Sequence, residues 1–473
     1  MPDRDARIAD HPCYSQDAHQ YYARMHVPVA PGCNIQCNYC NRKFDCANES
    51  RPGVTSSLLT PEQALAKVQR VAGGVRQLRV VGVAGPGEPL ANANRTFRTL
   101  ELLGRHCPDL RLCLSTNGLT LPDHVDRIVA LGVEHITVTI NAIDPEVGAS
   151  IYPWVAFRGR RYTGAAAARL LLDRQLEGLA ALAARDVLCK VNSVLIPGVN
   201  DDHLVEVSRT VRGLGAFLHN VLPLVSRPEH GTVFGLAGQR EPRFAELTAL
   251  RERCEAACGT SMTVMRHCRQ CRADAVGLLG EDQGAEFEPA AEFEPAVGAE
   301  PAVGAVGWVG LDEVGYDLGG RAETRAGIER WRTEVAAARV AAGIATGGAD
   351  RPAGPVTVAV ATTGGGVVNQ HFGRAREFWI YEAAGRWSRF VGIRKVPGSC
   401  AGPVECGEPS PVLDQTIALL ADCAAVLCAK IGPQPHGALV AAGIRPVEVH
   451  DLIDNAVAAV GAEVTAGRQA ARR

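Results

Sequence analysis

Residues 78–89 read LRVVGVAGPGEP, a short apolar run rich in β-branched side chains that ends in glycine and proline. Such a run predicts a buried strand, at 78–84, followed by a turn. Similar runs predict further strands at 110–115, 135–141, 187–196 and 217–225. Helical patterns between and around them predict helices at 60–72, 95–104, 123–131, 165–184, 202–214 and 246–258. Strand–helix alternation at this spacing predicts a parallel α/β fold, a partial (βα)6 barrel of the TIM type that stops short of eight units.

The length of 473 residues allows two or three domains, at about 150 residues each. Lysine and arginine total 49 against 51 acidic residues, so no charge excess predicts a nucleic-acid or anionic-membrane partner. No apolar run reaches the length of a membrane helix, and the N-terminus lacks the apolar core of an export signal. We therefore expect a cytoplasmic protein.

The periodic pattern breaks in an acidic repeat. The sequence AEFEPA occurs at 285–290 and 291–296, and EPAVGA occurs at 294–299 and 300–305. This composition predicts a disordered linker, with a helix at 321–343 in the same connection. A second α/β domain is predicted from strands at 356–361, 377–382, 424–428 and 446–450 and helices at 414–420 and 437–442. The predicted domains are 1–280, 281–354 and 355–473.

The chain has 16 cysteines, and without an export signal such a number favours metal binding over disulfides. Cys33, Cys37 and Cys40 follow the pattern C-x3-C-x2-C on one short loop. Three thiolates placed so can hold three irons of a [4Fe–4S] cluster and leave the fourth iron free. The alternative is a zinc loop with a distant fourth ligand. The spacing resembles the cluster loop of radical S-adenosylmethionine (SAM) enzymes.

Polar residues follow or end the predicted strands, at the barrel face where such folds carry their sites. The segment from Gly85 through Gly87 to Glu88 resembles the family's segment for the methionine amino group of SAM. The other candidates for SAM binding are Ser115, Thr116, Asn117, Asn141 and Asn192. A structural hydrogen-bonded cap is the alternative for each of them.

The chain has more cysteines than one [4Fe–4S] cluster needs as ligands, and a histidine lies close in sequence to one of them. The additional candidate ligands are His11, Cys13, Cys46, Cys113, Cys268 and Cys271. Cys113 lies two residues before Ser115, so both should face the same side of a strand. We interpret Cys107 and Cys189 as small buried apolar residues, and Cys254 with Cys258 as one packed helix face.

The stretches 11–50, 115–118 and 267–282 closely resemble the NifB family, the radical SAM maturases of nitrogenase cofactor assembly. The resemblance extends over 1–283 and 355–460. It implies a SAM-binding [4Fe–4S] cluster and two further [4Fe–4S] clusters as substrate. The implied reaction inserts a SAM-derived carbon and fuses the two clusters into the 8Fe–9S–C precursor of the iron–molybdenum (FeMo) cofactor. The implied enzyme class is a lyase or a transferase.

The resemblance also implies roles for residues. Cys33, Cys37 and Cys40 would hold the SAM cluster. One substrate cluster would be bound by His11, Cys46 and Cys113, and the other by Cys13, Cys268 and Cys271, with the division of His11 and Cys13 left open. The candidate proton-handling residues are Glu88, His26 and His135.

The sequence VAVATTGGGVVNQHFGRAREFWIYE, which begins at residue 358, resembles the NifX/NafY-like cofactor-binding domain with a ribonuclease H-like fold. His371 is the candidate ligand there, and Cys400 and Cys406 could assist it. The implied partners are cluster donors, cofactor carriers or scaffolds, and an electron donor such as ferredoxin or flavodoxin. Two other hypotheses remain: a radical SAM enzyme for a small organic substrate, with auxiliary electron-transfer clusters, and a non-catalytic iron–sulfur carrier.

Overall fold

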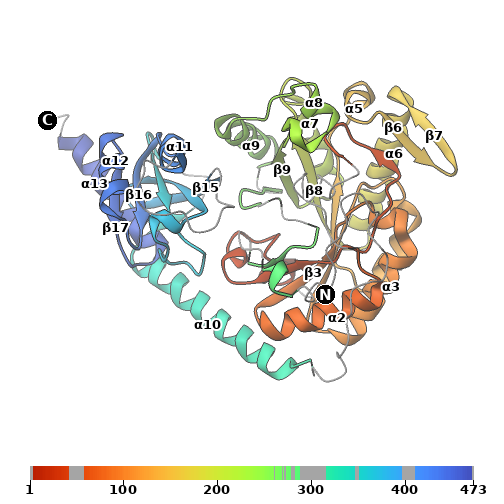
Figure 1. The fold of residues 1–473 in the computed structure, drawn as a ribbon, viewed down its shortest axis with the longest axis horizontal. Coiled ribbons are helices and arrows are strands. Elements are labelled where there is room, and N and C mark those ends of the chain that lie inside the picture. The colour runs from red at the N-terminus through yellow and green to blue at the C-terminus, as the bar shows by residue number, and fades with distance from the viewer. Residues whose placement is uncertain are drawn as a thin grey trace. The chain divides into compact units, whose positions relative to one another are not determined.

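The computed structural model describes residues 4–41, 58–259, 262–268, 270, 273–278, 283–287, 316–346, 351–396 and 411–470. Cys46, Cys271, Cys400, Cys406 and the acidic repeat beyond residue 287 lie outside this set. The chain separates into two compact units, Met1–Ala322 and Glu323–Arg473. Figure 1 shows the secondary structure of both.

The first unit is built on an eight-stranded sheet with the order β10-β9-β8-β5-β4-β3-β1-β11. Every neighbouring pair is parallel except β1 with β11. The strands are β1 (Ala23–His26), β3 (Leu78–Val83), β4 (Arg111–Thr116), β5 (His135–Thr139), β8 (Leu188–Leu195), β9 (Leu218–Pro223), β10 (Thr263–Val264) and β11 (Val276–Gly277).

A helix follows each of the six longer parallel strands, which confirms the predicted partial (βα)6 barrel. These helices are α2 (Pro61–Gly74), α3 (Ala93–His106), α4 (Val125–Ala130), α6 (Gly164–Ala183), α7 (His203–Gly213) and α9 (Phe244–Cys258). Shorter helices are α1 (Arg4–Ile8), α5 (Pro145–Ile151) and α8 (Val233–Leu236). The predicted start of α2 is confirmed, because the Thr60 hydroxyl accepts from the Gln63 N–H and Gln63 reciprocates in a capping box.

The sequence patterns did not predict a small second sheet, with the order β2-β6-β7. It joins β2 (Ile35–Gln36), inside the cysteine loop, to a hairpin of β6 (Trp154–Phe157) and β7 (Arg160–Thr163). Strands of two and four residues are too short to produce a readable alternation.

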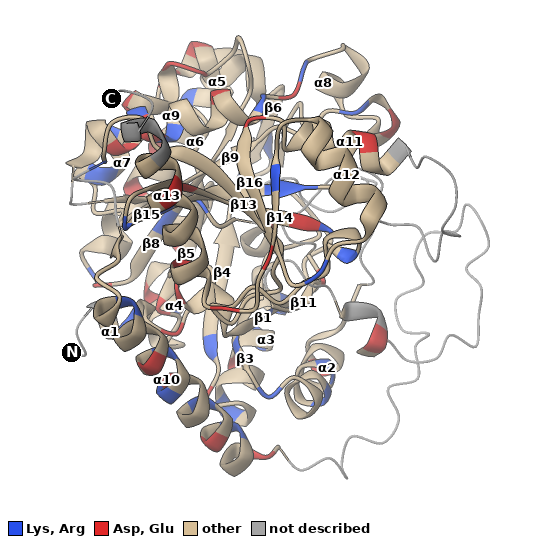
Figure 2. Cartoon of the chain, turned by 90° about the vertical axis from the view of Figure 1, so that its left-hand side faces the viewer, with Lys and Arg blue, Asp and Glu red and all other residues tan. Residues whose placement is uncertain are grey.

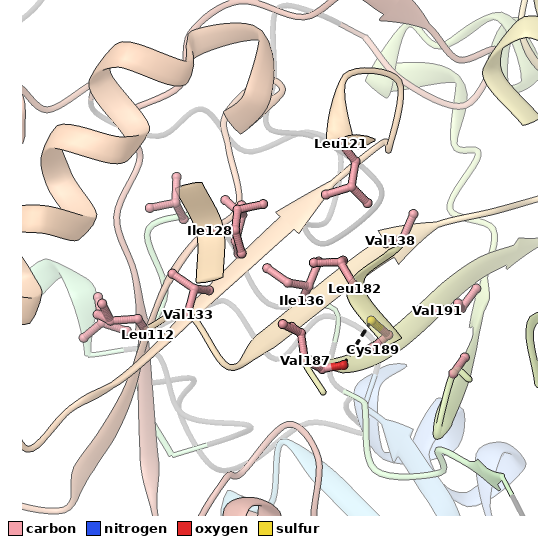
Figure 3. Packing of buried hydrophobic residues seen from close by; sticks show 14 of the residues in the cluster. Leu112, Leu121, Ile128, Val133, Ile136, Val138, Leu182, Val187, Cys189 and Val191 are labelled. Carbon is pink, nitrogen blue, oxygen red and sulfur yellow. Dashed lines mark hydrogen bonds between the residues drawn. The ribbon is translucent and has the colours of Figure 1, made fainter. Parts of the chain in front are cut away.

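Alternate residues of the parallel strands pack outward into the apolar core beneath the helices. Figure 3 shows Ile136 and Val138 of β5 in this layer beside Leu182 of α6. Cys189 belongs to the same layer, and its thiol donates to the Val187 carbonyl at 3.4 Å. Cys107 is also fully buried, so both cysteines are apolar packing residues as predicted.

The second unit contains a mixed sheet with the order β12-β15-β14-β13-β16-β17. Its strands are β12 (Ala345–Thr346), β13 (Val356–Val360), β14 (Glu377–Ala384), β15 (Trp387–Lys395), β16 (Cys423–Cys428) and β17 (Arg445–Glu448). Its helices are α11 (Pro411–Leu419), α12 (Pro433–Ala441) and α13 (Ile453–Ala470). The predicted smaller α/β domain is therefore present with its own core.

The helix α10 (Leu318–Ala341) confirms the helix predicted at 321–343. It carries acidic and basic residues along its length (Figure 2). The boundary between the two units falls within it. None of the described helices is long and apolar enough to cross a membrane.

Candidate functional site

The inward-facing residues of the barrel form polar rows across neighbouring strands. In the first row, successive Cα partners are His26, Gly82, Cys113 and His135. The next row contains Ser115, Thr137 and Lys190, and a third contains Thr139, Asn192 and Asn220. Barrels of this type usually fill their interior with Val, Ile and Leu. Polar groups that converge in a barrel interior are instead typical of a site that orients a ligand.

Gly82 allows His26 and Cys113 to approach one another. A Cβ on Gly82 would lie 3.2 Å from the His26 ring and 3.5 Å from the Cys113 Cβ. Both His26 and Cys113 stay partly exposed although they lie on central strands. The two residues therefore flank Gly82 in the barrel interior, and both remain partly accessible.

The N-terminal segment brings His11 to the same row. The His11 ring stacks on Tyr14 at 4.2 Å and lies 4.4 Å from the His135 ring, between centroids. His11 is fully buried, and its Nε2 has no hydrogen-bond partner. Burial lowers the pKa of His11 well below its usual value, and the charges of His135 and Lys190 lower it further. A neutral imidazole with an unused nitrogen is the form that binds metal.

Ion pairs fasten this segment to the strand starts. Asp10 accepts from Arg79 of β3 at 2.5 Å and from Arg111 of β4 at 2.7 Å. Burial raises the pKa of Asp10, but the two guanidinium groups outweigh that effect and hold the pKa below its usual value. Arg7 donates to the Asp186 carboxylate at 2.8 Å, just before β8. The segment is therefore held against the N-terminal ends of several strands.

Two more candidate ligands lie near Tyr14. Cys13 and Cys268 both pack against the apolar cluster that contains Tyr14, Phe217 and Met265. The structure thus places Cys13 and Cys268 against the same group of apolar side chains. His11 lies beside the row that contains Cys113 and His135. Cys46 and Cys271 lie outside the described residues.

The cluster loop, residues 31–41, leaves the C-terminal end of β1. Cys37 is buried, whereas Cys33 and Cys40 are partly exposed. The Cys40 N–H donates to the Cys37 carbonyl at 3.1 Å, which closes a turn. The Gln36 side-chain amide donates to the carbonyls of Cys37 and Cys40 at 3.0 and 2.9 Å. Burial raises the pKa of the Cys37 thiol well above its usual value, and the Cys40 and Cys33 thiols raise it further.

The thiol set fits the predicted [4Fe–4S] cluster. Three cysteine thiolates are the ligands that iron–sulfur clusters use. Cys37 lies in a buried apolar cluster, and Cys33 and Cys40 both pack against that same cluster. Within the described residues, no three His, Cys, Asp or Glu side chains converge so as to hold a single metal ion. A cluster does not need such convergence, because each thiolate binds a different iron.

The segment after β3 lies directly against the cluster loop. The Gly87 N–H donates to the Ala30 carbonyl at 2.6 Å, and the Glu88 N–H donates to the Gly32 carbonyl at 2.7 Å. A Cβ on Gly87 would lie 2.3 Å from the Gly32 carbonyl oxygen. Only glycine can occupy position 87 without moving the loop. The Gly85 carbonyl adds a further contact, accepting from the Ala30 N–H at 3.1 Å.

The Glu88 carboxylate ties the ends of β3 and β4 together. It accepts from the Thr116 hydroxyl at 2.5 Å, the Asn117 N–H at 2.6 Å and the Leu90 N–H at 2.9 Å. Burial raises the pKa of Glu88 to about 7, although these three donors favour the carboxylate. The Asn117 side chain in turn donates to Asn34 of the cluster loop at 2.7 Å. Ser115, which is also buried, immediately precedes Thr116 on β4.

Asn141 and Asn192 also have protein partners. The Asn141 amide donates to the hydroxyls of Tyr39 and Tyr152 at 2.6 and 2.8 Å, and its oxygen accepts from the Val194 N–H at 2.7 Å. Asn141 thus positions Tyr39, which lies between two of the loop cysteines. Asn192 accepts from the Asn220 amide at 3.0 Å, inside the barrel.

His371 lies in the second unit, where it is partly exposed. It caps a short 3-10 helix, Phe372–Arg374, and its Nδ1 accepts from the Gly373 N–H at 3.0 Å. The preceding Gly364, Gly365 and Gly366 all have positive φ angles, a conformation that glycine adopts without strain.

Of the interior residues that were not sequence candidates, Lys190 is the charged one among the rows described above. Lys190 is 4% exposed, and its Nζ lies 5.6 Å from the centre of the Tyr14 ring. Its position two residues before Asn192, in the alternation of a strand, is the signal that could have revealed it. Lys190 places a positive charge beside the row that contains Cys113.

Two family models match separate parts of this chain. Residues 27–211 match the family model described as "Radical SAM superfamily", and residues 354–463 match "Dinitrogenase iron-molybdenum cofactor". The crystal structure of SuiB from Streptococcus suis bound to S-adenosylmethionine is similar with a TM-score of 0.38 and 13% identity, over 55% of this chain and 52% of that chain.

Curated relatives are similar over nearly the whole chain. The FeMo cofactor biosynthesis protein NifB of Frankia alni is 62% identical over 476 residues, which cover 99% of this chain and 90% of the relative. The protein of the same name from Azotobacter vinelandii is 49% identical, over 97% of this chain and 89% of the relative. This chain therefore belongs to the NifB family of radical SAM proteins.

Proposed function

We propose that this chain is the radical SAM maturase of the FeMo cofactor. It inserts a carbon from SAM and fuses two [4Fe–4S] substrate clusters into the 8Fe–9S–C precursor. The observation that carries the proposal is the barrel interior, where Cys113 and His11 approach one polar row in a chain 62% identical to a named NifB. A carrier protein would need no such site beside a SAM-binding segment.

Cys33, Cys37 and Cys40 would hold the resident cluster, and SAM would bind at the adjoining strand ends. With both bound, the site supplies a 5′-deoxyadenosyl radical for hydrogen abstraction. The chain's own contribution is to orient the loop. The backbone contacts of Gly87 and Glu88 hold residues 30–32 in place, and Asn117 holds Asn34. Ser115, Thr116, Asn141 and Asn192 would complete the SAM-binding region.

The substrate clusters would lie deeper in the barrel. His11, Cys46 and Cys113 would bind one cluster, and Cys13, Cys268 and Cys271 would bind the other. The joint packing of Cys13 and Cys268 supports this division. Lys190 supplies positive charge that offsets the negative charge of a thiolate-bound cluster. Three protein ligands leave one iron of each substrate cluster free, as fusion requires.

His26 and Glu88 are the proposed proton-handling residues. His26 flanks Gly82 opposite Cys113, so its ring lies next to the proposed substrate position. Burial raises the pKa of Glu88 to about 7, a value suited to exchanging a proton near neutral pH. Such a reaction belongs to the lyase or transferase type.

The second unit would receive the product, with His371 as its ligand. The match of residues 354–463 to the iron–molybdenum cofactor family supports this role. The partners of the proposed cycle are iron–sulfur cluster donors, cofactor carriers of nitrogenase assembly, and a reductant for the SAM cluster.

The test is the variant Cys40→Ala, prepared without oxygen and compared with the unaltered chain. We expect about 12 irons per unaltered chain, four for each of three clusters, and about 8 per variant chain. The variant should form no 5′-deoxyadenosine with SAM and dithionite. Formation at the unaltered rate would contradict the assignment of this loop. About 4 irons in the unaltered chain would contradict the two substrate clusters.

A further inference from the structure

The hairpin of β6 and β7 is joined directly to the cluster loop. Ile35 pairs with Val155, and Gln36 pairs with Trp154. The Ala156 N–H donates to the Asn34 carbonyl at 2.7 Å. Gln36 immediately precedes Cys37, so the first strand of the hairpin lies one strand spacing, about 5 Å, from the loop backbone.

The second strand of the hairpin is the outer edge of this small sheet and is strongly basic. The 26 residues from 147 to 172 contain four arginines and no acidic residue, in a chain of net charge −2. Arg158, Arg160 and Arg161 lie on the hairpin, and all three are exposed. Figure 1 shows this hairpin projecting at the margin of the first unit.

Aromatic rings lie beneath these guanidinium groups. The Arg161 guanidinium carbon is 4.4 Å from the centre of the Trp154 ring, and that of Arg160 is 5.0 Å from the Tyr162 ring. Stacking of this kind holds Arg160 and Arg161 in place without neutralising them. Arg158 lies 4.0 Å from the Asp123 carboxylate, at the limit of an exposed ion pair. Trp, Tyr and Arg are also the residue types that contribute most to protein–protein binding.

We propose that the 154–163 hairpin is the docking surface for a small acidic electron-carrier protein, one with a low-potential flavin or iron–sulfur group. The inference rests on the proposed function, since it assigns the cluster of Cys33, Cys37 and Cys40 as the electron acceptor. One electron passes from the reduced carrier to this cluster, and no covalent bond changes in that step. Complementary charge is what selects an acidic carrier and speeds its association.

A charged edge strand can also serve only to prevent strand pairing between molecules. That role would need no specific carrier and would not affect electron delivery. Kinetics with two different reductants separate the two roles. They also separate failure of this inference from failure of the proposed function.

The experiment compares the full chain with the triple variant Arg158→Gln/Arg160→Gln/Arg161→Gln. Formation of 5′-deoxyadenosine is measured first with dithionite and then with a purified acidic flavodoxin kept reduced by its NADPH-dependent reductase. We expect equal rates with dithionite. With flavodoxin, we expect the KM for the carrier to rise about tenfold in the variant, with kcat little changed.

Two controls define the effect. The variant Arg158→Lys/Arg160→Lys/Arg161→Lys keeps the charge and should keep most of the affinity for flavodoxin. The variant Arg70→Gln/Arg105→Gln removes exposed charges from α2 and α3 and should leave the KM unchanged. Added salt should raise the KM of the unaltered chain more steeply than that of the triple glutamine variant.

An unchanged KM in the triple glutamine variant would overturn the docking proposal, and so would an equal rise in the α2 and α3 control. Absence of 5′-deoxyadenosine from the unaltered chain with dithionite would instead overturn the proposed function. A loss of dithionite-driven activity in the glutamine variant alone would show that the hairpin shapes the cluster loop, which also contradicts a docking role.

Discussion

At the scale of single residues, the candidate site depends on side chains whose hydrogen bonds fix the position of other site residues. Asn141 is the clearest example, because its amide makes three buried hydrogen bonds. Its partners belong to three separate segments: Tyr39 in the cluster loop, Tyr152 after α5, and Val194 on β8. Burial raises the pKa of Tyr152 well above its usual value, so its hydroxyl stays protonated and available.

We therefore predict that Asn141→Ala lowers the free energy of unfolding by about 1–3 kcal/mol, because buried groups lose their partners. Urea unfolding followed by circular dichroism measures this change. Asn38→Ala is the matched control, since Asn38 in the same loop makes a single exposed bond, to the Ser150 carbonyl at 2.7 Å. An effect of Asn141→Ala no larger than that of the control would show that the three bonds add little.

At the scale of elements, the barrel layers are joined by a buried histidine. His219 of β9 is fully buried, with its ring nitrogens 2.7 Å from the Ser208 hydroxyl of α7 and 2.9 Å from the Ser193 hydroxyl of β8. Burial, and then the charge of Arg251, lowers the pKa of His219 to about 4. The His219 ring is therefore neutral in the folded protein near pH 7.

A histidine whose pKa is lower in the folded chain takes up a proton on unfolding in mild acid. Its contribution to stability is complete above the unfolded pKa of about 6.5 and is lost as the pH falls toward 4. We predict a loss of about 2 kcal/mol from this group between pH 7 and pH 5.

The variant His219→Gln cannot titrate, so its unfolding free energy should fall less over this range than that of the unaltered chain. Urea titrations of both proteins at pH 7 and pH 5 give the comparison. Equal pH dependence of the unfolding free energy in the two proteins would show that His219 does not cause this loss of stability.

At the scale of the whole molecule, the two units have separate hydrophobic cores. The proposed SAM and substrate-cluster ligands all lie within the first unit, Met1–Ala322. His371 alone among the proposed ligands belongs to the second unit. Among the described residues, the barrel core contains no side chain from a strand of the second unit.

We predict that deleting residues 355–473 leaves 5′-deoxyadenosine formation with dithionite within about twofold of the full chain, because separately packed domains fold independently. The same truncated chain should retain less of the finished cofactor precursor during gel filtration. Loss of 5′-deoxyadenosine formation on truncation would show that the second unit supports the barrel.

Local patterns in the sequence were enough to predict five strands of the barrel, the six longer helices around them and the cysteine loop. They did not predict β1 in the first unit, nor β15 and α13 in the second. Strand and helix periodicities are properties of neighbouring residues, and so are the spacing of Cys33, Cys37 and Cys40 and the capping box at Thr60. The strands β2, β6 and β7 were missed because they have only two to four residues each, and because β2 forms only by pairing with β6, far along the chain.

Only the tertiary structure decided which residues meet. His11 reaches His135, and Asn141 reaches Tyr39 across 102 positions, because parallel strands and their closing segment bring distant residues into register. The sequence determined that this chain has a cysteine cluster loop on a (βα)6 scaffold. The fold alone placed His26, Cys113 and Lys190 in adjoining rows of one polar interior, since inward direction depends on strand register rather than on residue type.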